Sequence, residues 1–137
     1  NSEGASPLQV PSHAFAPYNA QATVHTRPAM WATLLPVSVP GRVSDIWRGY
    51  FAQALFRDLD LRLTFLPPRV VKDQNEHSDL ADKKAESDLY FKTGQLLQFL
   101  DHWHSPLTTV PERMQALWIE LYERGYIEQE DVLMVQR

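Results

Sequence analysis

The stretch from residue 40 to residue 57 constrains the fold of this chain more than any other. Pro40 and Gly41 form a sharp corner, Asp45 follows four residues later, and a strongly apolar segment continues behind it. The apolar residues recur on one broad face of a helix, namely Ile46, Trp47, Tyr50, Phe51, Ala54 and Leu55. Only a sizeable hydrophobic core can cover such a face, so the pattern predicts a packed domain around a helix that ends near Arg57.

Asp45 is expected at or just inside the N-terminus of this helix, where free N–H groups and the helix dipole stabilise a carboxylate. A helix N-cap is an ordinary role for an aspartate in such a position. An acidic side chain on a rigid, buried helix is also a good mount for a catalytic group. These residues alone leave both interpretations open and favour the cap.

Composition excludes several classes of protein. The 137 residues suffice for one domain or a piece of one, and a hydrophobic content of 44% predicts a packed core. A net charge of −4 offers no basic surface for nucleic acid, and the absence of cysteine excludes disulfides and thiolate metal sites. No apolar run approaches the roughly 18 residues of a membrane span. The beginning at Asn1 lacks the features of a signal peptide and suggests a cut from a longer chain.

The first half of the chain is expected to contain few regular elements besides this helix. Residues 1–20 carry three prolines among small residues and predict an extended lead-in. Pro28 suits the first turn of a short helix over residues 28–35. Alternating apolar residues predict a strand over residues 61–66, and after a proline pair the extended path is expected to resume over residues 69–72.

The second half is expected to be mostly helical. Residues 73–88 are the most polar stretch and predict a solvated loop, and a helix is expected over residues 87–103. Residues 109–112, Thr-Val-Pro-Glu, form a capping-box signature with proline in the first turn of an amphipathic helix. Gly125 is suited to end that helix, and a last helix begins near Glu128.

Few motifs in the chain carry chemistry. Asp58 and Asp60 form a D-x-D pair, but the pair ends a helix and precedes a strand, so a turn is predicted rather than a metal motif. His102 and His104 flank a tryptophan at a helix end, and no zinc-binding histidine motif occurs. His77 follows a predicted strand and is a candidate ligand, although a solvated loop is the simpler interpretation. Hydrolase, P-loop and Rossmann motifs are also absent.

The order of several motifs resembles the C-terminal region of STELLO-like proteins. The motifs fall within roughly residues 14–103 and recur with similar spacing, at residues 15–23, 29–32, 35–40, 42–53, 65–68 and 84–100. STELLO-like proteins are Golgi type II membrane proteins described as probable glycosyltransferases, and the plant members act in cellulose synthase assembly. The resemblance implies a protein of the Golgi lumen, with its membrane anchor outside this chain, that takes a UDP-sugar donor and a glycan acceptor.

A weaker likeness connects the chain with the plant UDP-arabinopyranose mutases, or reversibly glycosylated polypeptides, which have a GT-A-like fold. Their Asp-Asp-Met-Trp motif is similar to residues 44–47, Ser-Asp-Ile-Trp, and a histidine after their next strand lies near His77. The likeness implies that Asp45 is the catalytic base toward the acceptor hydroxyl and that His77 completes a metal shell. Ser44 replaces the first aspartate of the mutase pair. The first half of a GT-A domain, with its nucleotide pocket and true D-x-D motif, has no counterpart here.

Four further residues are candidates for contacts with substrate. Asn19 and Gln21 lie in a short polar stretch typical of a loop that contacts sugar, and equally of an ordinary turn. Arg42 and Arg48 flank Asp45, where they either bind donor phosphates or pair with the aspartate. The resemblance implies Mn²⁺ or Mg²⁺ as the cofactor of the full-length protein, with no metal bound by this fragment alone.

Together these features predict an α/β fold, the C-terminal half of a GT-A-like glycosyltransferase domain followed by a helical extension. Residues 1–13 form the lead-in, residues 14–103 the GT-A-like subdomain and residues 104–137 a truncated helical extension. The fragment alone is expected to be inactive. The alternative is a non-catalytic, glycosyltransferase-like scaffold that binds a protein partner or a second copy of the chain. A purely helical interaction module becomes the better interpretation if residues 61–71 form no strand.

Overall fold

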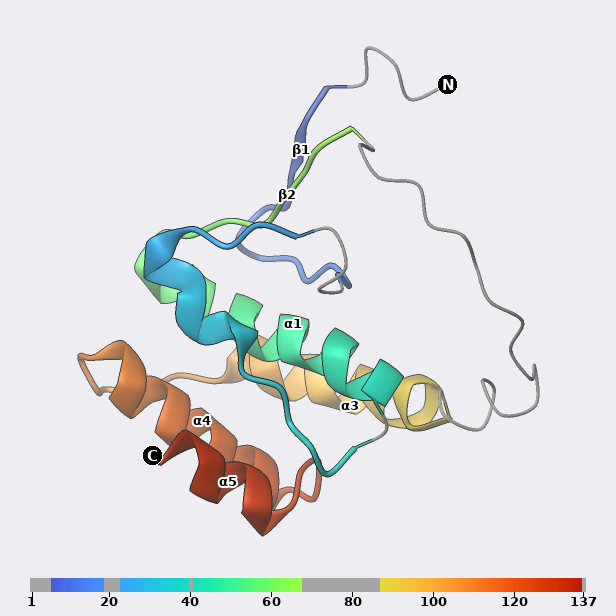
Figure 1. Ribbon diagram of the computed structural model, residues 1–137, viewed down its shortest axis with the longest axis vertical. Coiled ribbons are helices and arrows are strands. Elements are labelled where there is room, and N and C mark those ends of the chain that lie inside the picture. Colours follow the sequence, from blue (N-terminus) through green and yellow to red (C-terminus); the bar gives the residue numbers. More distant parts are fainter. Residues whose placement is uncertain (1–5, 19–22, 40, 68–86, 137) are drawn as a thin grey trace.

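The computed structural model describes residues 6–18, 23–39, 41–67 and 87–136. Its elements are β1 (Leu8–Gln9), the 3₁₀-helix η1 (Arg27–Thr33), α1 (Gly41–Leu59), β2 (Thr64–Phe65), α3 (Ser87–His102), α4 (Val110–Glu123) and α5 (Gln129–Val135). The described part is mostly helical, with one small two-stranded sheet that projects from the helical body (Figure 1). The expected mixture of helices and sheet is present, but the sheet is a short antiparallel ribbon.

In the part of the chain that the structure describes, four α-helices enclose the main hydrophobic core. α1 packs against α3 and α4, and α5 packs against α4 (Figure 1). The largest fully buried apolar side chains come from three of these helices: Trp47, Phe51, Leu96, Leu100, Leu117, Trp118 and Leu121. α5 adds the buried Val132 to the same cluster. The helices of the expected C-terminal extension therefore share their core with α1 and α3.

The beginning of α1 differs from the expectation. The helix begins at Gly41, about one turn before Asp45, and its first turn contains no acidic residue. The N-cap interpretation of Asp45 is therefore wrong. The preceding residue, Ser44, is buried, and its hydroxyl donates to the carbonyl oxygen of Pro36. The Ser-Asp pair thus makes side-chain contacts with the surrounding structure instead of capping the helix.

The other expected elements of the first half are present in shortened form. Pro28 lies in the first turn of η1, as predicted. The strand predicted over residues 61–66 is present as β2, which pairs antiparallel with β1 so that Leu8 lies opposite Phe65. The presence of this strand argues against a purely helical module. Residues 68–86, which include the expected extended path and most of the polar loop, lie outside the described residues.

The residues predicted to begin and end the C-terminal helices are confirmed in these roles. The Thr109 side chain accepts a hydrogen bond from the N–H group of Glu112, and proline occupies the first turn of α4. Gly125 has a φ of 83°, a conformation that costs glycine little and ends the helix. A capping box between Glu128 and Asp131 opens α5. None of the helices in the described ranges has the length and apolar character needed to cross a membrane.

The segment that precedes η1 and contains Ala16 and Tyr18 contacts α1 through side chains and backbone. The amide of the buried Gln53 accepts a hydrogen bond from the N–H group of Ala16 at 2.9 Å and donates to the Ala16 carbonyl at 2.7 Å. One turn earlier in α1, Gly49 faces Tyr18. A β-carbon at Gly49 would lie 3.0 Å from Cε1 and 3.3 Å from the carbonyl oxygen of Tyr18. Glycine therefore allows the Tyr18 backbone to approach the helix closely.

Alanine substitutions at Gly49 and at Gly94, a second helical glycine, should change the free energy of unfolding differently. Gly94 lies in α3, and a β-carbon there would meet nothing within 4 Å outside the backbone of its own helix, so Gly94→Ala should stabilise the chain by about 0.5–1 kcal/mol through helix propensity. Gly49→Ala gains the same propensity but must displace Tyr18, and overpacking of this kind costs about 1–3 kcal/mol. Urea unfolding of both variants measures the difference. Equal stabilisation by both substitutions would show that Tyr18 does not pack against α1.

Candidate functional site

Arg48 is the centre of the polar cluster around Asp45. Its side chain lies on α1 and is only 2% exposed. One guanidinium nitrogen, Nη2, donates to Oδ1 of Asp45 at 2.6 Å. The other, Nη1, lies 3.4 Å from the carbonyl oxygen of Ala32 and 3.4 Å from Nε2 of His25. A buried cation needs such partners, because an unpaired charge in the protein interior is costly.

Tyr18 covers this guanidinium group. The Arg48 Cζ atom lies 5.0 Å from the centroid of the Tyr18 ring, within the range of a cation–π interaction. Burial raises the pKa of Tyr18, while Arg48 opposes the shift and Asp45 adds to it. The phenol is therefore neutral at physiological pH. Its hydroxyl is buried and has no hydrogen-bond partner among the described residues.

His25 also contacts the guanidinium group and lies two residues before the start of η1. Its ring centroid is 6.1 Å from that of Tyr18. Burial and, to a lesser degree, the Arg48 charge lower the pKa of His25 below its ordinary value of 6.5. The imidazole is therefore neutral above that pH, as an acceptor of a hydrogen bond from arginine must be.

Asp45 is a member of the cluster that reaches solvent. Its side chain is 25% exposed, compared with 2% for Arg48. The ion pair spans one turn of α1 and orients the carboxylate from a rigid helix whose opposite face is in the core. A carboxylate held in this way can take a proton from a hydroxyl group that approaches from solvent. The geometry therefore places an oriented acidic group at the surface with a buried cation behind it.

The remaining candidate residues are distributed as follows. Asn19, Gln21 and His77 lie outside the described residues, and Arg42 is the second residue of α1. The sequence left two roles open for Arg48, phosphate binding and an ion pair with Asp45, and in the structure Arg48 forms the ion pair. The functions assigned to these residues remain predictions.

Sequence reasoning missed three residues that build this cluster: His25, Ala32 and Gly49. His25 is 23 positions from Arg48 and contributes a ring nitrogen, and Ala32 contributes a backbone carbonyl. Gly49 contributes only the space that Tyr18 occupies. No local pattern marks any of the three, because each acts through a contact that exists only after the chain has folded.

The described part of the chain does not contain the ligands of a metal site. No group of three or more histidine, aspartate or glutamate side chains comes together in it. The two aspartates of the D-x-D pair are each matched by an arginine, Asp58 by Arg113 and Asp60 by Arg62. Asp60 also has a φ of 55°, which identifies it as a turn residue after α1. These carboxylates therefore belong to ion pairs at the surface.

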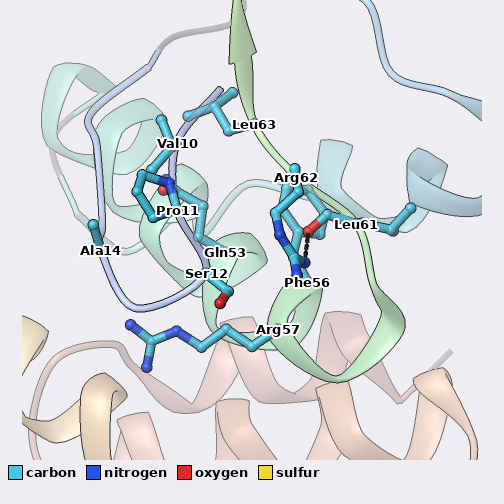
Figure 2. Close-up of a pocket in the computed structure, with 10 residues that line it drawn as sticks. All are labelled: Val10, Pro11, Ser12, Ala14, Gln53, Phe56, Arg57, Leu61, Arg62 and Leu63. Atoms are coloured by element: carbon cyan, nitrogen blue, oxygen red, sulfur yellow. Dashed lines mark hydrogen bonds between the residues drawn. The ribbon is translucent and has the colours of Figure 1, made fainter. Parts of the chain in front are cut away.

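Two small hollows formed by described residues lie beside α1, and neither resembles a nucleotide pocket. The first lies between residues 10–14 and the end of α1 (Figure 2), and its empty volume of about 220 Å³ includes space that is open to solvent. Both arginines of this hollow have partners within the chain. Arg57 pairs with Asp101 through Nη1 and lies over the Phe15 ring, and Arg62 donates to the Leu61 carbonyl. The second, of about 190 Å³, is lined by aromatic and aliphatic side chains with Arg48 in its wall.

A comparison with protein families decides the relationship of the chain. The model of the STELLO glycosyltransferases matches residues 42–137. The chain belongs to the STELLO glycosyltransferase family. The match begins just before Asp45 and extends over α1, α3, α4 and α5. It therefore includes the Asp45–Arg48 ion pair, while Tyr18 and His25 precede it.

Individual relatives agree with this membership. The chain is 32% identical to the protein named Probable glycosyltransferase STELLO2 of Arabidopsis thaliana and 29% identical to Probable glycosyltransferase STELLO1 of the same plant. Each comparison covers 126 residues, which is 91% of this chain but 16% of the relative. No solved structure matches the chain. The resemblance to STELLO-like proteins found in the sequence is thus confirmed.

Proposed function

We propose that the chain forms the acceptor side of a glycosyltransferase that uses a nucleotide-sugar donor. Two observations support the proposal: membership of the STELLO glycosyltransferase family and the oriented, partly exposed carboxylate of Asp45. The Asp45–Arg48 ion pair is the observation that carries the assignment of a site. The proposal includes the fold, the C-terminal half of a GT-A-like domain, and a location in the Golgi lumen.

Asp45 acts in this proposal as the general base toward the acceptor. As an acceptor hydroxyl attacks the anomeric carbon, its proton passes to the Asp45 carboxylate, and the bond between the sugar and the nucleoside diphosphate breaks. General-base catalysis of this kind contributes about 10²–10⁴-fold to a rate. Arg48 keeps the carboxylate in position because Nη2 bonds to Oδ1 and Nη1 is held by the Ala32 carbonyl and the His25 ring.

The donor and its metal are assigned to other parts of the protein. The described residues do not fit Mn²⁺ or Mg²⁺, because no three of their carboxylate or histidine side chains cluster and both aspartates of the D-x-D pair are matched by arginines. His77 stays a proposed ligand outside the described residues, as do the sugar contacts proposed for Asn19 and Gln21. The chain spans 16% of its STELLO relatives, so ample sequence in that family is available for a donor site. No step proposed for Asp45 passes through the metal.

Activity of the natural polypeptide that carries this chain tests the proposal. It is incubated with a panel of UDP-sugars and glycan acceptors with and without Mn²⁺, and donor binding and transfer are measured separately. Asp45→Asn should lower transfer by about 10²–10⁴-fold and leave donor affinity nearly unchanged. Asp101→Asn is the matched control, because Asp101 also pairs with an arginine of α1, Arg57, at 2.9 Å. It should leave transfer unchanged.

Two outcomes would contradict the proposal in different ways. If no UDP-sugar binds with or without Mn²⁺, the protein is not a donor-dependent transferase, and a scaffold that binds partner proteins takes its place. If donor binds but Asp45→Asn and Asp101→Asn transfer sugar equally well, Asp45 is not the base. Loss of folding in the Asp45 variant would be visible in its circular dichroism spectrum, and would assign the ion pair to stability instead.

A further inference from the structure

The contact between His25 and Arg48 connects two parts of the chain that are separate in sequence. His25 lies one residue before Thr26, the residue that precedes η1, and Arg48 lies in the middle of α1. The Arg48 Nη1 atom is 3.4 Å from the imidazole Nε2. The carbonyl of Thr26 in turn accepts a hydrogen bond from the N–H group of Ala29 at 2.8 Å, which forms the first turn of η1. A change at His25 therefore affects the start of η1.

This contact requires a particular protonation state of the histidine. A guanidinium group can only donate hydrogen bonds, so Nε2 of His25 must accept one. Acceptance by Nε2 requires the neutral imidazole with its proton on Nδ1. Protonation of the ring places a hydrogen on Nε2 and converts the acceptor into a donor that points at another donor. The hydrogen bond cannot survive that change.

Charge reinforces the same conclusion. In the described part of the chain, two charged or titratable groups face His25. They are Arg48 of α1 and Tyr18, which precedes η1 in the sequence. Asp45 belongs to the cluster through its bond to Arg48, and the neutral phenol of Tyr18 adds no charge. The Arg48–Asp45 pair sums to zero, so a protonated His25 adds an uncompensated positive charge beside a buried cation. Like charges at this distance in a partly buried site repel each other.

We propose that His25 is a pH-sensitive contact whose protonation releases residues 23–26 and the start of η1 from α1. The neutral ring holds this segment over Arg48, and the protonated ring does not. Release uncovers the buried guanidinium group and the polar side of the cluster. This inference concerns the packing of the segment and does not depend on the role proposed for Asp45.

The direction of the pH dependence follows from the folded-state pKa of His25. Burial and Arg48 lower that pKa below 6.5, so the folded segment binds fewer protons than the released one. The stability of the packed segment is therefore complete above the ordinary pKa and decreases as the pH falls through 6.5 toward the folded pKa. Neutral conditions favour the packed state and mildly acidic conditions favour release.

Hydrogen exchange provides the test. In the wild-type chain, protection of the Ala29 N–H group should be high at about pH 7.5 and lost at about pH 5.5, on either side of the range in which histidine titrates. The Val37 N–H group, which donates to Asp131 at 2.6 Å, should stay protected at both values and serves as an internal control. His25→Gln should keep Ala29 protected at both pH values, because glutamine offers a neutral acceptor. His25→Lys should lose this protection even at the higher pH.

Matched variants and a second measurement keep the inference open to contradiction. His104→Gln replaces an exposed histidine and should leave the pH dependence of the wild-type chain intact. Equal pH dependence in the wild type and His25→Gln would overturn the inference, as would full protection of Ala29 in His25→Lys. If the variants fail to fold, titration of the His25 ring in the wild-type chain by NMR decides. A ring that titrates at or above 6.5 contradicts the proposed contact.

Discussion

Replacing Asp131 with alanine should reduce the free energy of unfolding by about 3–4 kcal/mol, because several donors lose a buried, charged acceptor at once. Asp131 lies in the first turn of α5 and is completely buried. Its Oδ1 atom accepts from the Val37 N–H group at 2.6 Å, and its Oδ2 atom accepts from the Ser38 hydroxyl. The Glu128 N–H group also donates to Oδ2, at 3.4 Å. One carboxylate thus attaches the loop before α1 to the last helix.

Urea unfolding of Asp131→Ala and Glu130→Ala measures this effect. Glu130 precedes Asp131 in the same helical turn and is exposed, so its substitution should change stability by no more than about 0.5 kcal/mol. Asp131→Asn should give an intermediate loss, because the amide keeps one acceptor oxygen and presents donors to the other partners. A loss for Asp131→Ala within error of that for Glu130→Ala would mean that the loop and α5 are not joined by this residue.

The second large effect is expected at the contact between α1 and α4. Trp118 is 1% exposed, and its ring packs edge-on against Phe51 of α1 with the centroids 5.8 Å apart. Trp118→Ala removes the largest side chain of α4 from the core and leaves a cavity between two helices. Truncations of buried tryptophan cost about 3–5 kcal/mol, a large part of the roughly 5–15 kcal/mol that stabilises a typical domain.

Tyr122→Ala is the matched control for this substitution. Tyr122 follows one turn later on α4 and is 41% exposed, so its truncation should cost less than about 1 kcal/mol. Thermal and urea unfolding followed by circular dichroism compare the two variants. If Trp118→Ala were no more destabilising than Tyr122→Ala, α4 would not share a core with α1, and residues 104–137 would be an independent extension.

Local signals in the sequence predict the elements of this chain well. The Thr109 cap, the proline in the first turn of α4 and the stop at Gly125 are all present, because each acts within one helical turn of itself. The apolar face of α1 also predicts its own burial, since Trp47 and Phe51 are both at most 2% exposed. By contrast, Ser-Asp at residues 44–45 resembles a cap and is not one, because the helix begins earlier, at Gly41, and both side chains have other partners.

The family itself was also accessible from the sequence, because its motifs recur in order along the chain. The pairing of β1 with β2 was not, since Leu8 and Phe65 are brought together only when the intervening chain folds. Similarly, the sequence marks Asp45 and Arg48 as neighbours but leaves open whether Arg48 binds phosphate or the aspartate. Burial of Arg48 under Tyr18 favours the ion pair, because a buried cation needs a nearby anion.

The sequence by itself determined where helices begin and end in the second half, which helical faces are buried, and the STELLO relationship. These properties depend on residues within a few positions of one another or on the order of motifs. The tertiary structure alone decided which polar residues hold the molecule together. Asp131 meets Val37 across 94 positions, and His25 meets Arg48 across 23. Hydrogen-bond partners and burial arise from packing between distant segments, and that packing selects a few polar side chains from many that look alike along the chain.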